Sequence, residues 1–254
     1  AGQSNVKESW TNQIVTYDAN IKLTSNLLEA VRCSNVWETV KVLTIGSAEE
    51  YGRVAPSLMP IKEDTELKPT TPYGISKAAV SMLVRIYREA YKLNVVHVRP
   101  FNHIGPGQKL GFVTQDFAKQ IAEIEKGIGM PVIRVGNLEA RRDFLDVRDI
   151  VNAYRMIATN PNVFGRPEYV YNVCSGVPTK IHDLLDELIK LSDVAIDIIY
   201  APEKFRPIDV DIYVGSRDRI RDIVGWEPQI PLRSSLQGIL EDWRSRLLRG
   251  NNNG

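Results

Sequence analysis

The chain has 254 residues, of which 43% are hydrophobic and 25% charged, and its formal net charge is +1. This length and composition are typical of a globular protein with a substantial core, built as one large or two small domains. The near-zero net charge gives no electrostatic reason to expect nucleic acid or an acidic membrane as a partner. No apolar run approaches the ~20 residues that span a bilayer.

The apolar patterns of the first hundred residues alternate between helical and extended spacing. They predict, in chain order, a helix at 14–32, a strand at 40–45, a helix at 71–90 and a strand at 94–100. Thr71 can cap the third of these elements, and Pro72 suits the first helical position. Buried strands alternating with helices are typical of a parallel sheet, whose ligands bind beyond the carboxyl ends of the strands.

The second half of the chain mixes the two spacings less regularly. It predicts a helix at 112–126, strands at 131–137 and 168–173, a helix at 181–191, a strand at 195–200, and helices at 216–224 and 232–248. Gly225 is expected to close the helix before it. We interpret this half as a smaller α+β lobe that closes over the edge of the sheet.

Tyr73 and Lys77 lie four residues apart, one turn apart on the predicted helix, so both side chains share a face. An ammonium beside a phenol favours the phenolate and lowers the tyrosine pKa, which suits proton transfer at a C–OH/C=O centre. Ser47 follows the strand at 40–45 and is expected at the same edge of the sheet. The spacing alone also fits an ordinary helix-face pair and a serine that only caps a turn.

Three motifs resemble the extended short-chain dehydrogenase/reductase family: "GSAEEYG", "YGISK" and "RPFNHIGPG". The resemblance implies a catalytic set of Ser47, Tyr73 and Lys77, with NADP or NAD as the hydride carrier. Longer stretches look like one branch of that family, the GDP-4-keto-6-deoxy-D-mannose reductases. These are "GQSNVKESW", "FNHIGPGQKLGFVTQDFAKQI", "GNLEARRDFLDVRDIVNAY" and "RPIDV".

The family fold is a Rossmann-like, doubly wound parallel sheet with a smaller α+β substrate-binding lobe. By this resemblance, residues 1–106 are the C-terminal part of the dinucleotide-binding domain. Residues 107–244 are mainly the substrate-binding lobe, with some segments returning to the sheet, and 245–254 form a polar tail. No G-x-x-G-x-x-G turn is present in the sequence, so we expect an N-terminally incomplete sheet and a fragment of a longer enzyme.

The implied reaction is reduction of the C4 ketone of GDP-4-keto-6-deoxy-D-mannose to GDP-D-rhamnose, with Tyr73 as the proton donor. The resemblance and the suitability of arginine for diphosphate give candidates on both sides of the site. The substrate-binding candidates are Glu49, Asn102, Val113, Arg142, Arg206 and Asp209. The cofactor-binding candidates are Gly2, Gln3, Tyr73, Lys77 and Pro100, and we expect no metal.

Two other functions stay open. A GDP-mannose 4,6-dehydratase would use the same tyrosine and lysine with a glutamate base at C5, and Glu49 stands where that base would be. The segment "FLDVRDIV" resembles reductases and epimerases, which favours a reductase. The second alternative is a non-catalytic module that binds a nucleotide sugar, because half of the cofactor site is missing. The sequence decides neither NAD against NADP nor the stereochemistry at C4.

The resemblance also implies a homodimer joined through the two helices that flank the strand at 40–45. Four residues widen the apolar stripe of the second helix beyond what one sheet face needs, namely Leu83, Ile86, Tyr87 and Tyr91. The two cysteines, Cys33 and Cys174, are too few for a disulfide framework, although one bridge stays open. They fit buried free thiols in a cytoplasmic protein.

Overall fold

The computed structural model describes residues 2–204 and 210–250 and divides the chain into two compact units. Unit 1 comprises Ala1–Phe101, Ile150–Gly176 and Gly215–Glu227. Unit 2 comprises Asn102–Asp149, Val177–Val214 and Pro228–Gly254. Each unit is therefore assembled from stretches that lie far apart in the sequence.

Unit 1 is built on a parallel sheet with the strand order β1–β2–β6. The strands are β1 (Val42–Ile45), β2 (Val95–Pro100) and β6 (Val170–Val173). Val42 pairs with Val95, and His97 pairs with Val170. Every residue of the central strand β2 is buried, as expected for a parallel strand covered on both faces. The expected α/β class with parallel strands is confirmed.

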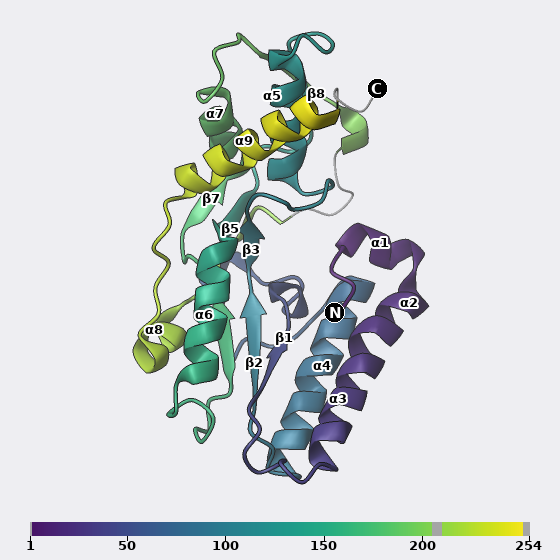
Figure 1. Cartoon of the computed structure of the whole chain (residues 1–254), viewed down its shortest axis with the longest axis vertical. Helices are drawn as coiled ribbons and strands as arrows, with labels where there is room; N and C mark the ends of the chain where they lie inside the picture. Colours follow the sequence, from purple (N-terminus) through teal and green to yellow (C-terminus); the bar gives the residue numbers. More distant parts are fainter. Residues whose placement is uncertain (1, 205–209, 251–254) are drawn as a thin grey trace. The chain divides into compact units, whose positions relative to one another are not determined.

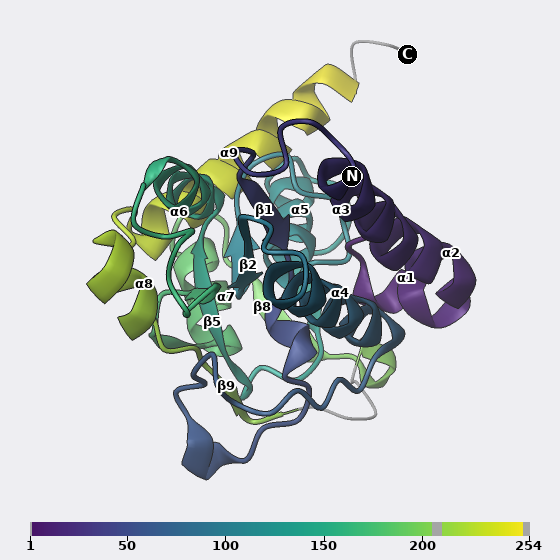
Figure 2. The same ribbon diagram turned by 90° about the horizontal axis from the view of Figure 1, so that it is seen from below.

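Helices cover both faces of this sheet, with α3 and α4 on one side and α6 on the other (Figures 1 and 2). These helices are α3 (Leu23–Arg32), α4 (Pro72–Glu89) and α6 (Val147–Thr159), and α8 (Asp218–Val224) lies beside β6. Leu28, Val84 and Val95 belong to the buried core between α3, α4 and the sheet. Their burial removes apolar surface from water and fixes α4 against the strands.

Helix α4 begins where the sequence predicts. The hydroxyl of Thr71 accepts a hydrogen bond from the Gly74 backbone N–H at 2.9 Å, and Pro72 occupies the first turn. This cap satisfies one of the backbone donors that a helix start leaves without an intrahelical partner. The predicted N-terminus of the helix is confirmed, and it sets the direction of the Tyr73 side chain.

The N-terminal segment differs from the single helix expected at 14–32. It contains α1 (Val6–Thr11), α2 (Gln13–Tyr17), a π-helical turn at Asp18–Lys22, and then α3. Asn5 caps α1 by accepting a hydrogen bond from the Glu8 backbone N–H at 3.1 Å. A π-helical turn inside a helix is uncommon and occurs frequently at functional sites.

Unit 2 contains the strand order β3–β5–β7, with β9 also pairing with β5, and a separate pair β4–β8. The strands are β3 (Asn102–Ile104), β4 (Val132–Val135), β5 (Arg141–Asp146), β7 (Pro178–Lys180), β8 (Asp197–Tyr200) and β9 (Ile212–Tyr213). Its helices are α5 (Val113–Glu125), α7 (Ile181–Ile189) and α9 (Leu232–Gly250). The core of the unit lies among these helices, and Trp243 donates to Gln115 at 2.8 Å inside it.

The strands β3, β5, β7 and β9 were not expected from the sequence. The expected closure at Gly225 is confirmed, because this residue ends α8 in the left-handed conformation with φ +74°. Helix α9 continues to Gly250, so the expected polar tail at 245–254 is helical as far as the structure describes it. In the described part of the chain, no helix is both long and apolar enough to cross a membrane.

Candidate active site

Ser47 stands at the carboxyl end of β1, where the chain turns into a short 3₁₀ helix (Ala48–Glu50). Its hydroxyl accepts a hydrogen bond from the Glu49 backbone N–H at 3.2 Å, and its own backbone N–H donates to the Glu50 carboxylate at 2.9 Å. Ser47 therefore caps this turn, which is one of the two roles that the sequence allows. It also hydrogen-bonds the Tyr73 side chain.

Tyr73 and Lys77 both lie on α4, one turn apart, on the face that meets the end of β1. The Tyr73 side chain is buried, and the backbone N–H of Tyr73 donates to the Ser9 hydroxyl at 3.2 Å. The Lys77 ammonium donates to the Ile45 carbonyl at 2.8 Å and lies 5.7 Å from the centre of the Tyr73 ring. The structure thus brings Ser47, Tyr73 and Lys77 together.

The electrostatics of Tyr73 differ from the expectation that Lys77 lowers its pKa. Burial raises the pKa of Tyr73 to about 12, because the phenolate loses its hydration inside the protein. The hydrogen bond with Ser47 acts in the opposite direction, while the charges of Glu49 and Glu50 raise the value further. The Lys77 ammonium instead satisfies a backbone carbonyl, and Tyr73 is a neutral phenol at physiological pH.

Lys77 is half-buried, and burial lowers the pKa of its ammonium, while the negative charge of Glu50 raises it. Glu49, the next candidate, is half-buried beside this set. A Cβ at Gly74 would come within 2.6 Å of the Glu49 carbonyl oxygen, so the turn after Ser47 packs directly against α4. The backbone contact holds Glu49 at the edge of the same group of residues.

The cofactor candidates at the N-terminus are held by Asn20, a residue that sequence reasoning missed. Asn20 accepts a hydrogen bond from the Gln3 backbone N–H at 3.0 Å, and its amide donates to the Gln3 carbonyl at 3.1 Å and the Ser76 hydroxyl at 2.9 Å. A Cβ at Gly2 would lie 2.6 Å from the Asn20 side-chain oxygen. The sequence could have indicated Asn20, because it is a polar residue on the buried side of the amphipathic helix predicted at 14–32.

Pro100, the remaining cofactor candidate, is the last residue of β2 and pairs with Val173. Of the substrate candidates, Asn102 is exposed on β3, and Val113 begins α5. Arg142 lies on β5, where its guanidinium donates to the carbonyls of Arg141 at 2.8 Å and Val210 at 2.6 Å. Arg206 and Asp209 lie outside the described residues.

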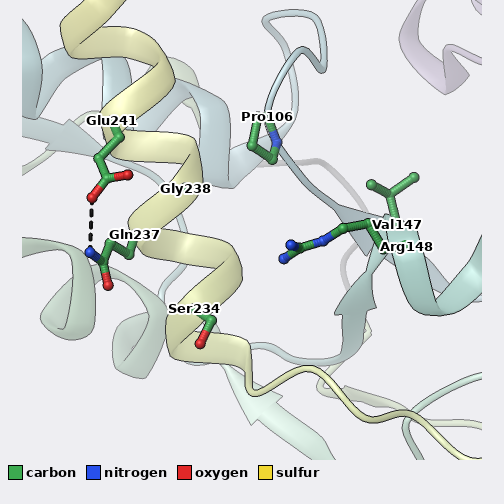
Figure 3. Close-up of a pocket in the computed structure, with 7 residues that line it drawn as sticks. All are labelled: Pro106, Val147, Arg148, Ser234, Gln237, Gly238 and Glu241. Atoms are coloured by element: carbon green, nitrogen blue, oxygen red, sulfur yellow. Dashed lines mark hydrogen bonds between the residues drawn. The ribbon is translucent and has the colours of Figure 1, made fainter.

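A cavity of about 380 Å³ lies within unit 2, and it contains none of these candidates. One wall is formed by Pro106, Val147 and Arg148, and the other by residues of α9 (Figure 3). On that second wall Gln237 donates to Glu241 at 2.8 Å. Both carboxylate oxygens of Asp146 hold the Arg148 guanidinium, at 2.8 and 2.9 Å.

The sequence is similar to those of enzymes that are named for GDP-sugars. The profile of the GDP-mannose 4,6 dehydratase family matches residues 1–239. The GDP-6-deoxy-D-mannose reductase of Pseudomonas aeruginosa is 37% identical over 247 residues, which cover 97% of this chain and 79% of the reductase. The GDP-mannose 4,6 dehydratase 2 of Caenorhabditis elegans is 30% identical over 243 residues, 91% of this chain and 63% of the relative.

Solved structures agree with the sequence comparison. The structure of RMD from Pseudomonas aeruginosa complexed with NADPH superposes with a TM-score of 0.87 at 36% identity, covering 97% of this chain and 80% of that one. A UDP-glucose 4-epimerase from Thermotoga maritima, solved with UDP-glucose, gives a TM-score of 0.84 at 25% identity, with 97% and 76% coverage. The fold and the sequence thus point to the same group of proteins.

Proposed function

The chain belongs to the GDP-mannose 4,6-dehydratase family, and from this membership we propose that it reduces the C4 ketone of GDP-4-keto-6-deoxy-D-mannose to GDP-D-rhamnose with NAD(P)H. The observation that carries the proposal is the meeting of Ser47, Tyr73 and Lys77 at the end of β1. The 37% identity to a GDP-6-deoxy-D-mannose reductase, against 30% to a dehydratase, favours reduction over dehydration.

Tyr73 is the proton donor in this proposal. Because burial keeps the phenol neutral, the hydroxyl carries a proton that it can give to the oxygen developing at C4. The Ser47 hydroxyl, which hydrogen-bonds Tyr73, is placed to bind the same oxygen and to orient the ketone. These two groups stabilise negative charge where it forms in the transition state.

The residues of unit 1 fit a nicotinamide dinucleotide. An ammonium has three donors, and the Ile45 carbonyl takes one of those of Lys77, so the side chain can also bind a ribose hydroxyl. At Gly2 a Cβ would lie 2.6 Å from the Asn20 side-chain oxygen, so glycine lets the N-terminal loop pack closely against Asn20. We assign Gly2, Gln3 and Pro100 to the same surface. The dinucleotide, when bound, supplies the hydride.

On the substrate side we propose that Asn102 and Arg142 bind the sugar nucleotide, with Arg142 on the diphosphate. A guanidinium has five donors in a planar fork that matches phosphate oxygens. Two backbone carbonyls already fix the direction of Arg142. We assign Val113, Arg206 and Asp209 to nucleotide binding and Glu49 to sugar binding, as the sequence predicts.

The enzyme carrying this sequence is expected to consume NAD(P)H with GDP-4-keto-6-deoxy-D-mannose but not with GDP-mannose. The segment "FLDVRDIV" and the 37% identity to a reductase favour reduction, although a dehydratase would also use a base at C5 and Glu49 stands where that base would be. Absorbance of the reduced nucleotide and chromatography of the GDP-sugars measure both reactions. Conversion of GDP-mannose to a 4-keto product without added dehydratase would contradict the proposal.

We also propose that the enzyme is a homodimer joined through α3 and α4. Exposed apolar side chains follow one stripe on each of these adjacent helices, Leu23 and Leu27 on α3 and Ile75, Met82 and Ile86 on α4. Of the residues expected there, Ile86 and Tyr91 are exposed, whereas Leu83 and Tyr87 pack against the core of unit 1.

Replacing Ile86 with glutamate is expected to convert the dimer into monomers at micromolar concentration, because a charge at the centre of an apolar contact loses its hydration on association. Light scattering measures the mass. Val151→Glu is the matched control, since Val151 is equally exposed on α6, outside the stripe. A monomeric mass for the unchanged enzyme would refute the dimer.

We propose a cytoplasmic location for the enzyme. Cys33 is exposed and Cys174 buried, and both are free thiols, which corrects the expectation that both are buried. An exposed free thiol is more compatible with a reducing compartment than with an oxidising one. Fractionation of cells that produce the protein tests the location, and recovery in a secreted fraction would contradict it.

A further inference from the structure

The Glu50 carboxylate is wholly buried next to the candidate active site, and its three hydrogen bonds join separate parts of unit 1. One oxygen accepts from the Ser47 backbone N–H and from His97 Nε2, each at 2.9 Å. The other accepts from Arg99 Nε at 2.7 Å. A buried carboxylate with these partners has a fixed position, because any displacement would leave a charge or a donor without a partner.

Arg99 extends the contact to the helix that carries Tyr73 and Lys77. Its guanidinium donates to the Ser81 hydroxyl on α4 at 2.9 Å, and also to the Tyr51 hydroxyl and the Glu63 carbonyl, each at 3.0 Å. The Glu50 carboxylate is thus connected to the Ser47 backbone directly and to α4 through one guanidinium. The planar fork of arginine fixes the directions of these bonds.

His97 orients the carboxylate from β2. Its Nε2 donates to Glu50, since an ionised carboxylate only accepts, and its Nδ1 lies 2.8 Å from the Thr44 hydroxyl on β1. Glu50 and His97 both pack against Gly46, the residue before Ser47. A Cβ at Gly46 would come within 2.1 Å of the Glu50 oxygen and 2.3 Å of His97 Nε2.

We propose that Glu50 is a positioning residue for the reduction: held by His97 and Arg99, its carboxylate fixes the Ser47 backbone so that the Ser47 hydroxyl meets Tyr73. The proposal rests on the function proposed above for Ser47, Tyr73 and Lys77. Glu50 has a second effect on the same set, because its charge opposes the lowering of the Lys77 pKa by burial. Neither effect requires Glu50 to touch the substrate.

A purely structural role would have different consequences. Buried charge clusters can hold strands together without any influence on a neighbouring site, and their loss then lowers stability alone. If Glu50 acts through Ser47, its replacement must lower kcat, and that loss must largely disappear when the Ser47 hydroxyl is already absent. A double-mutant cycle on kcat measures this coupling.

The cycle compares Glu50→Gln, Ser47→Ala and the double variant in the enzyme carrying this sequence. A glutamine amide cannot accept hydrogen bonds on both sides, so it loses either the Ser47 or the Arg99 contact. Glu50→Gln is expected to lower kcat by ~10- to 100-fold, the effect of a small displacement at a reacting centre, with KM for the GDP-sugar within about 2-fold. In the Ser47→Ala background the further loss is expected to stay below about 3-fold.

A milder variant keeps the test decisive if Glu50→Gln does not fold. Thr44→Val retains every charge and removes the hydroxyl that lies 2.8 Å from His97 Nδ1 and also donates to the Val96 carbonyl at 3.1 Å. It is expected to lower kcat by ~2- to 10-fold through the lost contact with His97, and to have no effect in the Ser47→Ala background, where loss of the bond to the Val96 carbonyl on the neighbouring strand can lower stability alone. The matched control is Glu63→Gln, since the buried Glu63 carboxylate accepts from the Asn172 backbone N–H at 2.9 Å and does not bind Ser47.

The outcomes separate the two proposals. Multiplicative losses in the double variants, or an equal loss of kcat in Glu63→Gln, would overturn the positioning role of Glu50 while leaving Ser47 in place. An unchanged kcat in Ser47→Ala alone would overturn the role of Ser47 and, with it, that of Glu50. Coupled losses at Glu50 and Thr44 with an unaffected Glu63 variant would support the proposal.

Discussion

Replacing Tyr73 with phenylalanine is expected to lower kcat for reduction of the 4-keto sugar by ~10²–10⁴-fold, the usual contribution of a positioned general acid. The change removes one hydroxyl from a buried ring and leaves the packing of α4 intact. The free energy of unfolding should therefore fall by no more than about 1 kcal/mol. Turnover of purified variants and urea unfolding measure the two effects.

Tyr87→Phe is the matched control on the same helix. The Tyr87 hydroxyl donates to the Glu29 carboxylate at 2.9 Å, so its removal also takes away one hydrogen bond from a buried ring. The variant should keep the turnover of the unchanged enzyme. A Tyr73→Phe enzyme with near-normal turnover would exclude Tyr73 as the proton donor, whatever the similarity to known reductases.

Replacing Gly46 with alanine is expected to lower the free energy of unfolding by about 3 kcal/mol or more and to reduce kcat as well. The new Cβ would overlap the Glu50 carboxylate and the His97 ring, at 2.1 and 2.3 Å. Although these are side-chain atoms, neither can withdraw, because Arg99 and Thr44 hold them from the other side. Displacing the carboxylate would weaken its buried ion pair with Arg99, and breaking such a pair costs about 3–5 kcal/mol.

Gly165→Ala provides the control for this substitution. Gly165 is in the same unit, and no atom lies within 4 Å of the position that its Cβ would take. It should change neither the urea midpoint nor kcat appreciably. Equal stabilities for Gly46→Ala and the unchanged enzyme would show that the Glu50–His97 contact can relax, and would weaken the argument for a fixed carboxylate.

The similarity of three short motifs, and not their spacing, identified the catalytic candidates in the sequence. A tyrosine followed four residues later by a lysine can arise by chance in a chain of this composition. A serine at a strand end is often only a cap. The structure shows that Ser47 is a cap and also a neighbour of Tyr73. The two interpretations are compatible, because the backbone bonds that make the cap also hold the hydroxyl in place.

The sequence by itself determined the local elements of this protein. Thr71 and Pro72 define the start of α4, and the four-residue spacing then places Tyr73 and Lys77 on one face. Gly225 ends α8 in the left-handed conformation. Each of these features depends on side chains within about one turn of one another, so the chain specifies it without reference to distant segments.

Only the tertiary structure decided the partners of the charged groups. Glu50 meets His97 and Arg99, 47 and 49 residues away, because β1 and β2 are neighbours in the sheet. Burial raises the pKa of Tyr73, and the Ile45 carbonyl takes a hydrogen bond from Lys77. Desolvation and long-range contacts depend on which elements pack together, and no local pattern encodes them.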